Sequence, residues 1–383
     1  MSFSLYIHIP WCQAKCPYCD FNSYAAASWP EPEYTRALIA EMTRRAGEAP
    51  WADSGQIKTI FFGGGTPSLF KPQSIGALIR GAERIFGLER DAEITLEANP
   101  GTVDLKKLDG MRAAGVNRIS FGAQSFNAST LKFLGRIHNA DQTREAARNA
   151  HRAGFGRLNL DLIFAVPGQS LAQIRFDIEQ AAALAPDHIS AYNLTFEEGT
   201  PFFADLKRGR IRPLENDDQA EMYALVREEL PARGYSMYEI SNYAQPGREA
   251  RHNLSYWRGE SYLGLGAGAH SFARDGAAGR RWWNERSPSR YLEHIKVHGL
   301  AEAGAETLDA RIAAGEFVFL NLRLAGGFAL NDFAVRFGQS FESMFGNIAQ
   351  PLINNGLLIR GQERIRLAKR GLEMADSVFA EFV

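Results

Sequence analysis

The chain has 383 residues, more than one ordinary hydrophobic core needs, so its length predicts a large domain and a smaller one. Its 43 Lys and Arg residues balance 44 Asp and Glu residues, and the net charge of −1 excludes a global field that would draw the protein onto nucleic acid or an anionic membrane. No apolar run is long enough to cross a bilayer and residues 1–4 lack the basic start of a signal peptide, so the expected location is the cytoplasm.

Short apolar runs alternate with helical stretches through the first half of the chain, the pattern of βα units around a parallel sheet. The apolar runs predict six strands, at residues 5–9, 59–62, 93–97, 118–121, 158–164 and 188–193. The stretches between them predict helices at residues 33–46, 74–86, 105–114, 144–153 and 171–183. Six units favour a partial (β/α)6, TIM-like barrel of the α/β class, in which a site lies at the C-terminal ends of the strands.

The second half of the chain has a different pattern. One more strand with an exit loop is expected near residues 235–243. The last part predicts helices at 311–322, 329–337 and 341–354, short strands at 357–359 and 364–367, and a final helix near 368–382. The expected domains are a barrel at 1–235, a connecting segment at 236–304 and a winged-helix-like module at 305–383. Because its third helix contains no Lys or Arg, this module is expected to pack as a lid and not to bind DNA.

All three cysteines of the chain, Cys12, Cys16 and Cys19, lie in one C-x3-C-x2-C run. Thiolates are soft ligands that suit iron–sulfur clusters. Three of them can hold three irons of a 4Fe–4S cube and leave the fourth iron open to a small molecule. Zinc is the alternative, with His8 as a fourth ligand. Disulfide pairing would leave one odd thiol.

Glycines and polar residues follow the predicted strands. The run Phe-Gly-Gly-Gly-Thr-Pro at residues 62–67 ends the second strand, and glycines let the backbone approach a ligand closely. A phosphate-binding loop would need a Lys after the glycines, which this run lacks. Glu97, Gln124, Arg136 and Asp161 lie at or near later strands. Asp161 alternates with apolar neighbours and is expected to face the barrel interior, in a ligand site or in an internal salt-bridge network.

The cysteine spacing, with a glycine run after the next strand, is typical of radical S-adenosylmethionine (SAM) proteins, and the chain resembles that superfamily. The resemblance implies a 4Fe–4S cluster on the three cysteines, SAM at the open iron and an external electron donor. It implies SAM contacts at Tyr6, Gly64, Gly65, Thr66, Glu97, Gln124, Arg136 and Asp161. An inward carboxylate suits the ammonium or ribose of SAM, and Arg136 suits its carboxylate. Tyr6 and His8 share one face of the first strand, which leads into the cysteine loop.

The resemblance is closer to one branch of the superfamily. Tyr-x-His-x-Pro before the cysteines, Leu-Glu-Ala-Asn-Pro and Phe-Gly-Ala-Gln-Ser resemble the coproporphyrinogen-oxidase-like branch, and the similarity covers nearly the whole chain. Oxygen-independent coproporphyrinogen oxidases carry a further cysteine where this chain has Phe21. HemW-type haem chaperones are marked by H-N-x-x-Y-W, present here at residues 252–257. Trp11 and Ala165 depart from the usual Phe and Gly of the branch without removing a ligand.

This resemblance implies a haem chaperone on a radical SAM scaffold that transfers haem to an acceptor protein. His252 is the expected haem contact, because neutral imidazole is a normal axial ligand of haem iron, and His270 is a second candidate. The alternative for His252 is a hydrogen-bonded structural histidine in a turn. Haem ligation by Cys16 is rejected, because the cluster would lose a thiolate. The alternative function is oxygen-independent coproporphyrinogen III oxidase, which leaves open whether the chain is an enzyme.

Overall fold

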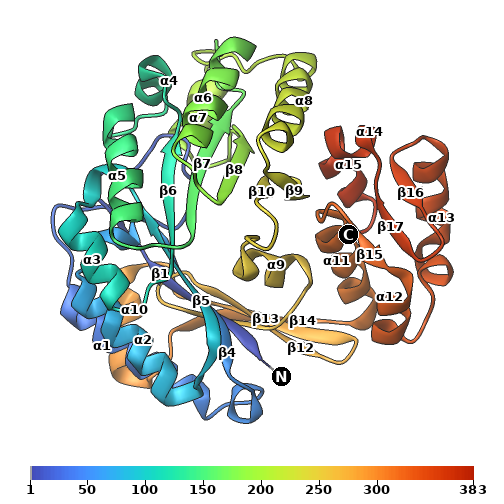
Figure 1. Ribbon diagram of the computed structural model, residues 1–383. Coiled ribbons are helices and arrows are strands. Elements are labelled where there is room, and N and C mark those ends of the chain that lie inside the picture. Colours follow the sequence, from blue (N-terminus) through green and yellow to red (C-terminus); the bar gives the residue numbers. More distant parts are fainter. Residues whose placement is uncertain (1) are drawn as a thin grey trace.

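The computed structural model describes residues 2–383, and its barrel follows the predicted βα order (Figure 1). Its wall consists of six parallel strands: β1 (Phe3–Ile9), β4 (Ile57–Gly64), β5 (Leu88–Ala98), β6 (Arg118–Gln124), β7 (Leu158–Phe164) and β8 (His188–Asn193). Every predicted strand is present, and most extend a few residues beyond the prediction. The predicted α/β class and partial (β/α)6 barrel are therefore confirmed.

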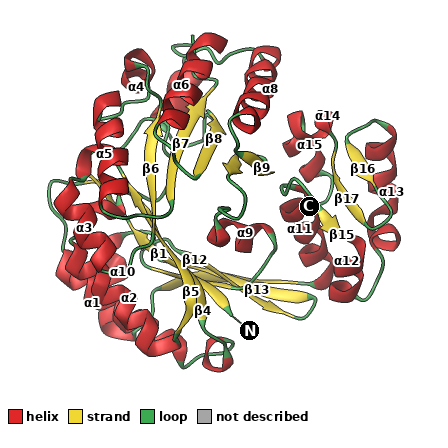
Figure 2. Cartoon of the chain, in the orientation of Figure 1, coloured by secondary structure: helices red, strands yellow, loops and turns green. Residues whose placement is uncertain are grey.

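Helices cover the outer face of these strands (Figure 2). They are α1 (Glu31–Ala46), α2 (Pro72–Phe86), α3 (Leu105–Ala113), α4 (Ala128–Phe133), α5 (Ala140–Arg152), α6 (Leu171–Ala183), α7 (Pro201–Lys207) and α8 (Asn216–Ala232), with 3-10 turns at Trp51–Asp53, Pro67–Leu69 and Pro100–Thr102. In α2, the apolar residues Ile75, Leu78 and Ile79 recur on one face and are buried against the sheet. α5 begins earlier than predicted, because Asn139 and Gln142 form a capping box at its N-terminus.

The sheet continues past the six strands at both edges. Beside β1 come β11 (Tyr262–Leu265), which is parallel to β1, and then the antiparallel strands β12 (His270–Asp275), β13 (Ala278–Asn284) and β14 (Glu302–Leu308). Beside β8 come β10 (Asn242–Ala244) and β9 (Ser236–Glu239), so the strand predicted near residues 235–243 is two short ones. In the described part of the chain the sheet has twelve strands and runs from β14 to β9 without closing.

Two further helices connect these added strands. α9 (Arg251–Trp257) precedes β11, and α10 (Pro288–His298) separates β13 from β14. Figure 1 shows α9 between the barrel strands and the C-terminal module. The short strands β2 (Trp11–Cys12) and β3 (Tyr24–Ala25) pair with each other and close the loop that carries the cysteines.

The C-terminal module contains the predicted three helices and hairpin. Its elements are α11 (Ala310–Leu322), β15 (Phe328–Ala329), α12 (Leu330–Phe337), α13 (Phe341–Asn354), β16 (Leu358–Arg360), β17 (Arg364–Leu367), α14 (Lys369–Glu373) and α15 (Ala375–Ala380). The final helix predicted near 368–382 is thus two short helices, and β15 adds a third strand. A cluster of phenylalanine rings, with Phe333 fully buried at its centre, gives the module a core separate from that of the barrel. The domain limits at 235 and 304 stay predictions.

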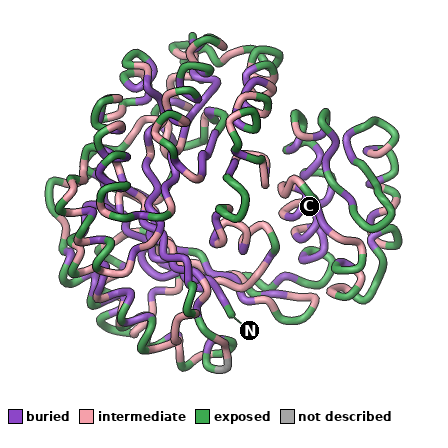
Figure 3. Tube along the Cα trace, viewed as in Figure 1, coloured by how far each residue is buried: buried purple, intermediate pink, exposed green. Residues whose placement is uncertain are grey.

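The module packs against the barrel near β9 and α8. Arg227 of α8 forms an ion pair of 2.7 Å with Glu373 of α14. Arg323 lies 4.3 Å over the ring of Trp257 and 3.4 Å from the buried Glu239 carboxylate. Figure 3 shows the buried residues concentrated along the barrel strands, with exposed residues on the outer helices and on the module's far side. Among residues 2–383, no helix combines the length and apolarity that crossing a membrane requires.

Candidate functional site

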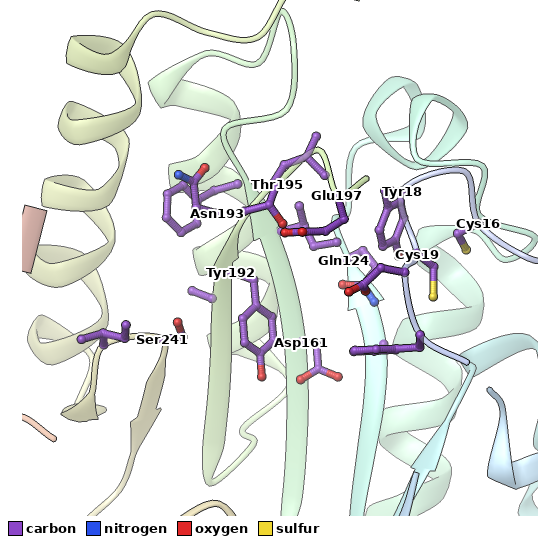
Figure 4. Close-up of a pocket in the computed structure, with 18 of the residues that line it drawn as sticks. Cys16, Tyr18, Cys19, Gln124, Asp161, Tyr192, Asn193, Thr195, Glu197 and Ser241 are labelled. Carbon is purple, nitrogen blue, oxygen red and sulfur yellow. The ribbon is translucent and has the colours of Figure 1, made fainter. Parts of the chain in front are cut away.

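A cavity of about 1130 Å³ lies where the strands β4 to β8 end. We call it the mouth cavity. Its lining includes the three cysteines, Gly64, Gly65, Thr66, Glu97, Gln124, Arg136 and Asp161. On the opposite side it is lined by residues of α14 and α15, so the C-terminal module forms part of its wall. Figure 4 shows Asp161 and Tyr192 on neighbouring strands, with Cys16 and Cys19 across the cavity from them.

The cysteine loop leaves the end of β1 and carries three thiols that form no disulfide. The Arg136 guanidinium donates to Cys16 Sγ at 3.2 Å, and Thr66 Oγ1 donates to Cys12 Sγ at 3.5 Å. Cys19 Sγ lies 4.0 Å from the Ser23 hydroxyl. Burial raises the pKa of Cys12 and of Cys19. The thiols of Cys12 and Cys19 therefore hold their protons and must release them when a metal centre binds.

The structure does not support the zinc alternative. His8, the proposed fourth ligand, has both ring nitrogens in hydrogen bonds, to the Tyr6 hydroxyl at 2.9 Å and to the Asn22 carbonyl at 2.8 Å. It lines a different cavity from the cysteines. Within residues 2–383, no three His, Cys, Asp or Glu side chains are arranged to hold a single metal ion. The thiols thus share one cavity without converging on one ion.

The glycine run connects the end of β4 to the cysteine loop. The Gly65 N–H donates to the Ile9 carbonyl at 2.8 Å, and the Thr66 N–H donates to the Trp11 carbonyl at 2.8 Å. A Cβ atom at Gly65 would lie 2.6 Å from the Trp11 carbonyl oxygen. Gly64 has a φ of +111°, in the region that favours glycine. The glycines are therefore needed for the fit of two backbone segments, in addition to any contact with a ligand.

Two carboxyl groups face the interior of the barrel. Asp161 accepts hydrogen bonds from Asn159 at 2.7 Å and from Ser120 at 3.3 Å, as its predicted inward direction requires. Burial raises the pKa of Asp161. Burial, followed by the charge of Asp161, raises the pKa of Glu97 to about 8. Glu97 therefore carries a proton at neutral pH unless a cation approaches it.

Gln124 and Arg136 present unpaired polar atoms at the mouth cavity. Gln124 has a φ of +66°, rare for a residue with a side chain, and such strain is concentrated at functional sites. Its Oε1 is buried without a hydrogen-bond partner among the described residues, and so is Nε of Arg136. Buried polar atoms normally have partners. An open acceptor and an open donor fit a ligand that carries both an ammonium and a carboxylate, as SAM does.

A second cavity of about 700 Å³ lies beside the mouth cavity, and we call it the aromatic cavity. Its lining includes Tyr6, His8, Phe61, His252, Tyr256, Tyr262, His270, Trp283 and Arg286. Phe21, Gly64 and Glu97 line both cavities. Tyr6, a predicted SAM contact, lines only the aromatic cavity, where it adjoins Glu97. Its contact with SAM stays a prediction.

His252 lies on α9 and not in the turn that was the alternative for it. Its Nδ1 is 2.8 Å from Thr59 Oγ1 and its Nε2 is 2.8 Å from the Tyr256 hydroxyl, while its ring stacks on Phe61 at 5.0 Å. Burial lowers the pKa of His252 to about 3, so the imidazole is neutral. Both nitrogens of His252 are thus hydrogen-bonded within the protein, as the structural alternative proposed, and its contact with haem stays a prediction.

Several residues that line the two cavities are absent from the predictions made from the sequence. Tyr192 lies two residues after the inward Ser190 on a predicted strand and shares its face, so the period of two could have identified it. Trp283 and Arg286 belong to the unpredicted strand β13 and the turn after it. Their place in the cavity depends on the pairing of β11 with β1, which no local pattern shows.

Comparisons with known proteins agree with this geometry. The sequence matches the Radical SAM superfamily over residues 6–181 and the HemN C-terminal domain over residues 308–373. It is 35% identical to the heme chaperone HemW of Bacillus subtilis (strain 168) over 99% of both chains. It is 44% identical to the heme chaperone HemW of Escherichia coli (strain K12) over 70% of this chain and 69% of that protein. The solved structure of the Escherichia coli coproporphyrinogen III oxidase HemN, at 24% identity, matches with a TM-score of 0.84 over 100% of this chain and 90% of that chain, which shows a shared fold.

Proposed function

The chain belongs to the HemW haem chaperone family of the radical SAM superfamily, and from this membership we propose that it holds a 4Fe–4S cluster, SAM and haem and transfers haem to an acceptor protein. Cys12, Cys16 and Cys19 would hold the cluster. When bound and reduced by an external donor, a cluster of this kind supplies an electron beside an iron without a protein ligand. The protein's part is to bind, orient and shield the two small molecules.

SAM is proposed to occupy the mouth cavity. The buried, unpartnered atoms of Gln124 and Arg136 support this location, because SAM offers an ammonium and a carboxylate to satisfy them. Glu97 on β5 and Asp161 on β7 flank the strand that ends at Gln124, line the same cavity and favour the positive parts of the ligand. Arg136 also donates to Cys16, so one guanidinium adjoins both the cluster ligand and the SAM space.

Phe21 is the observation that favours the chaperone over the coproporphyrinogen oxidase. It stands where the oxidase branch has a further cysteine, is 61% exposed and lines both cavities. An exposed phenyl ring offers an apolar surface for a porphyrin and no sulfur chemistry.

The test of this proposal uses the anaerobically reconstituted full chain. We expect it to bind ferric haem, seen as a shifted Soret band, and to pass that haem to apomyoglobin used as an acceptor probe. With reductant, SAM and coproporphyrinogen III, it should form no vinyl product by mass spectrometry. Vinyl product would instead favour the oxidase, and a chain that binds no haem would contradict the chaperone function.

SAM binding is expected to depend on pH through Glu97. Asp161, Arg118 and Tyr6 face this carboxyl group, and its pKa is raised to about 8. Below that pH the protonated Glu97 must lose its proton before it can pair with the cationic ligand. Affinity should therefore rise with pH, by up to about tenfold per unit, and level off above the pKa. Calorimetric titration across this range measures the slope.

The control for this pH dependence is Glu97→Gln, which keeps the shape of the side chain but cannot ionise. Titration of SAM itself affects both proteins equally, so the difference between their slopes belongs to Glu97. Equal slopes would show that Glu97 does not pair with the positive part of SAM.

A further inference from the structure

Three histidines line the aromatic cavity, and they differ in the state of their ring nitrogens. His8 has Tyr6 on one nitrogen and the Asn22 carbonyl on the other. His252 is held in the same way by Thr59 and Tyr256, as described above. A haem iron can bind His8 or His252 only if one of these buried hydrogen bonds breaks, which leaves a partner unsatisfied.

His270 is the third histidine and differs from the other two. Among residues 2–383, no hydrogen bond reaches its side chain, which is exposed at the start of β12. It is the cross-strand partner of Trp283 on β13, and the two rings stack with centroids 5.8 Å apart and planes 28° apart. This stacking holds the imidazole at the cavity wall and leaves its nitrogens free to bind a metal.

Two other features of the cavity suit a porphyrin. Its volume of about 700 Å³ is within the ~300–1000 Å³ typical of small-molecule and cofactor sites. Flat aromatic surface comes from Phe61, Tyr256 and Trp283. The exposed guanidinium of Arg286 lies at the same cavity and, in the described part of the chain, has no carboxylate partner. Arginine without an internal partner can pair with a carboxylate such as a haem propionate.

We propose that haem binds in the aromatic cavity with His270 as the axial ligand of its iron and a propionate paired with Arg286. This assignment rests on the proposed haem-chaperone function and identifies the place and the ligand. His252 then contacts the haem pocket through its hydrogen-bonded ring and does not ligate the iron.

The experiment titrates the reconstituted full chain with ferric haem and follows the Soret band and the low-temperature electron paramagnetic resonance spectrum. His270→Gly should raise the dissociation constant at least tenfold and remove the signature of nitrogen ligation. Added imidazole should restore that signature in His270→Gly, because the small ligand can occupy the space that the side chain leaves. Such a rescue would not follow if His270 served only to support the fold.

Two matched variants make the result decisive. His252→Gln should keep the wild-type ligation spectrum, and His298→Ala, on the exposed surface of α10, should leave both spectrum and affinity unchanged. The assignment is overturned if His270→Gly keeps the wild-type spectrum, if imidazole restores nothing, or if His252→Gln alone loses the ligation signature. If the wild-type chain binds no haem, the proposed function fails, and that outcome is distinct from the other three.

Arg286 is tested with a change in the ligand and not only in the protein. Arg286→Gln should weaken binding of haem severalfold but leave binding of haem dimethyl ester, which has no propionate charge, unchanged. Equal effects on the two ligands would show that Arg286 does not pair with a propionate.

Discussion

Replacing Cys12, Cys16 or Cys19 by serine, one at a time, is expected to reduce the bound iron from about four atoms per chain to almost none after anaerobic reconstitution. The structure provides no substitute ligand, because these are the only cysteines in the sequence. Iron and sulfide analysis, with the resonance spectrum of the reduced protein, measures the loss. The effect should be all or none, since a cluster held by two thiolates has two irons open to solvent.

The fold should survive these substitutions. None of the three cysteines belongs to the hydrophobic core of the barrel or to that of the C-terminal module, so circular dichroism of the serine variants should match that of the wild type. Gln13→Ala is the matched control, because Gln13 is an exposed residue of the same loop without a thiol. A serine variant that keeps its full iron content, or bound zinc in place of iron in the wild type, would contradict the cluster assignment.

Gly65→Ala is expected to have the second large effect, on stability and on SAM binding together. The new Cβ would lie 2.6 Å from the Trp11 carbonyl oxygen and 2.9 Å from the Pro10 carbonyl carbon. These are backbone atoms of the cysteine loop and cannot move as a flexible side chain can. We expect a loss of about 3 kcal/mol in the free energy of unfolding, the upper part of the range for overpacking. SAM affinity should fall as well, because the displaced loop carries the cluster ligands.

The control for Gly65→Ala is Gly156→Ala. A Cβ at Gly156 would meet no atom within 4 Å, and the residue has no positive φ. Chemical denaturation of both variants compares a crowded glycine with an open one. If the two variants lose the same small amount of stability, the close approach of β4 to the cysteine loop does not constrain position 65.

The barrel and the mouth cavity could be predicted from the sequence because their signals are local. Six short apolar runs mark the parallel strands, and most of the predicted site residues lie in these runs or within a few residues of their ends. The C-x3-C-x2-C run and the glycine run indicated the radical SAM superfamily, and the comparisons confirm that resemblance. The inward direction of Asp161 followed from the strand period of two, and its hydrogen bonds agree with it.

The aromatic cavity could not be predicted in the same way. It exists because β11 pairs with β1, a contact between residues 262–265 and 4–7 that are far apart in the chain. β14 is largely exposed and contains one large apolar residue, Leu308, so no apolar alternation reveals it as a strand. The state of each histidine also depends on distant partners, such as Thr59 for His252. A motif can therefore indicate which histidine matters without showing whether its nitrogens are free.

The wall that Gly64, Glu97 and Phe21 share between the two cavities has a thermodynamic consequence. Two ligands that contact these shared residues, one in each cavity, do not bind independently. Each ligand changes the charge and position of side chains that the other ligand contacts. By thermodynamic reciprocity, each ligand changes the affinity of the protein for the other ligand by the same factor. The occupancy of the mouth cavity can therefore control the release of a ligand from the aromatic cavity without a long-range conformational change.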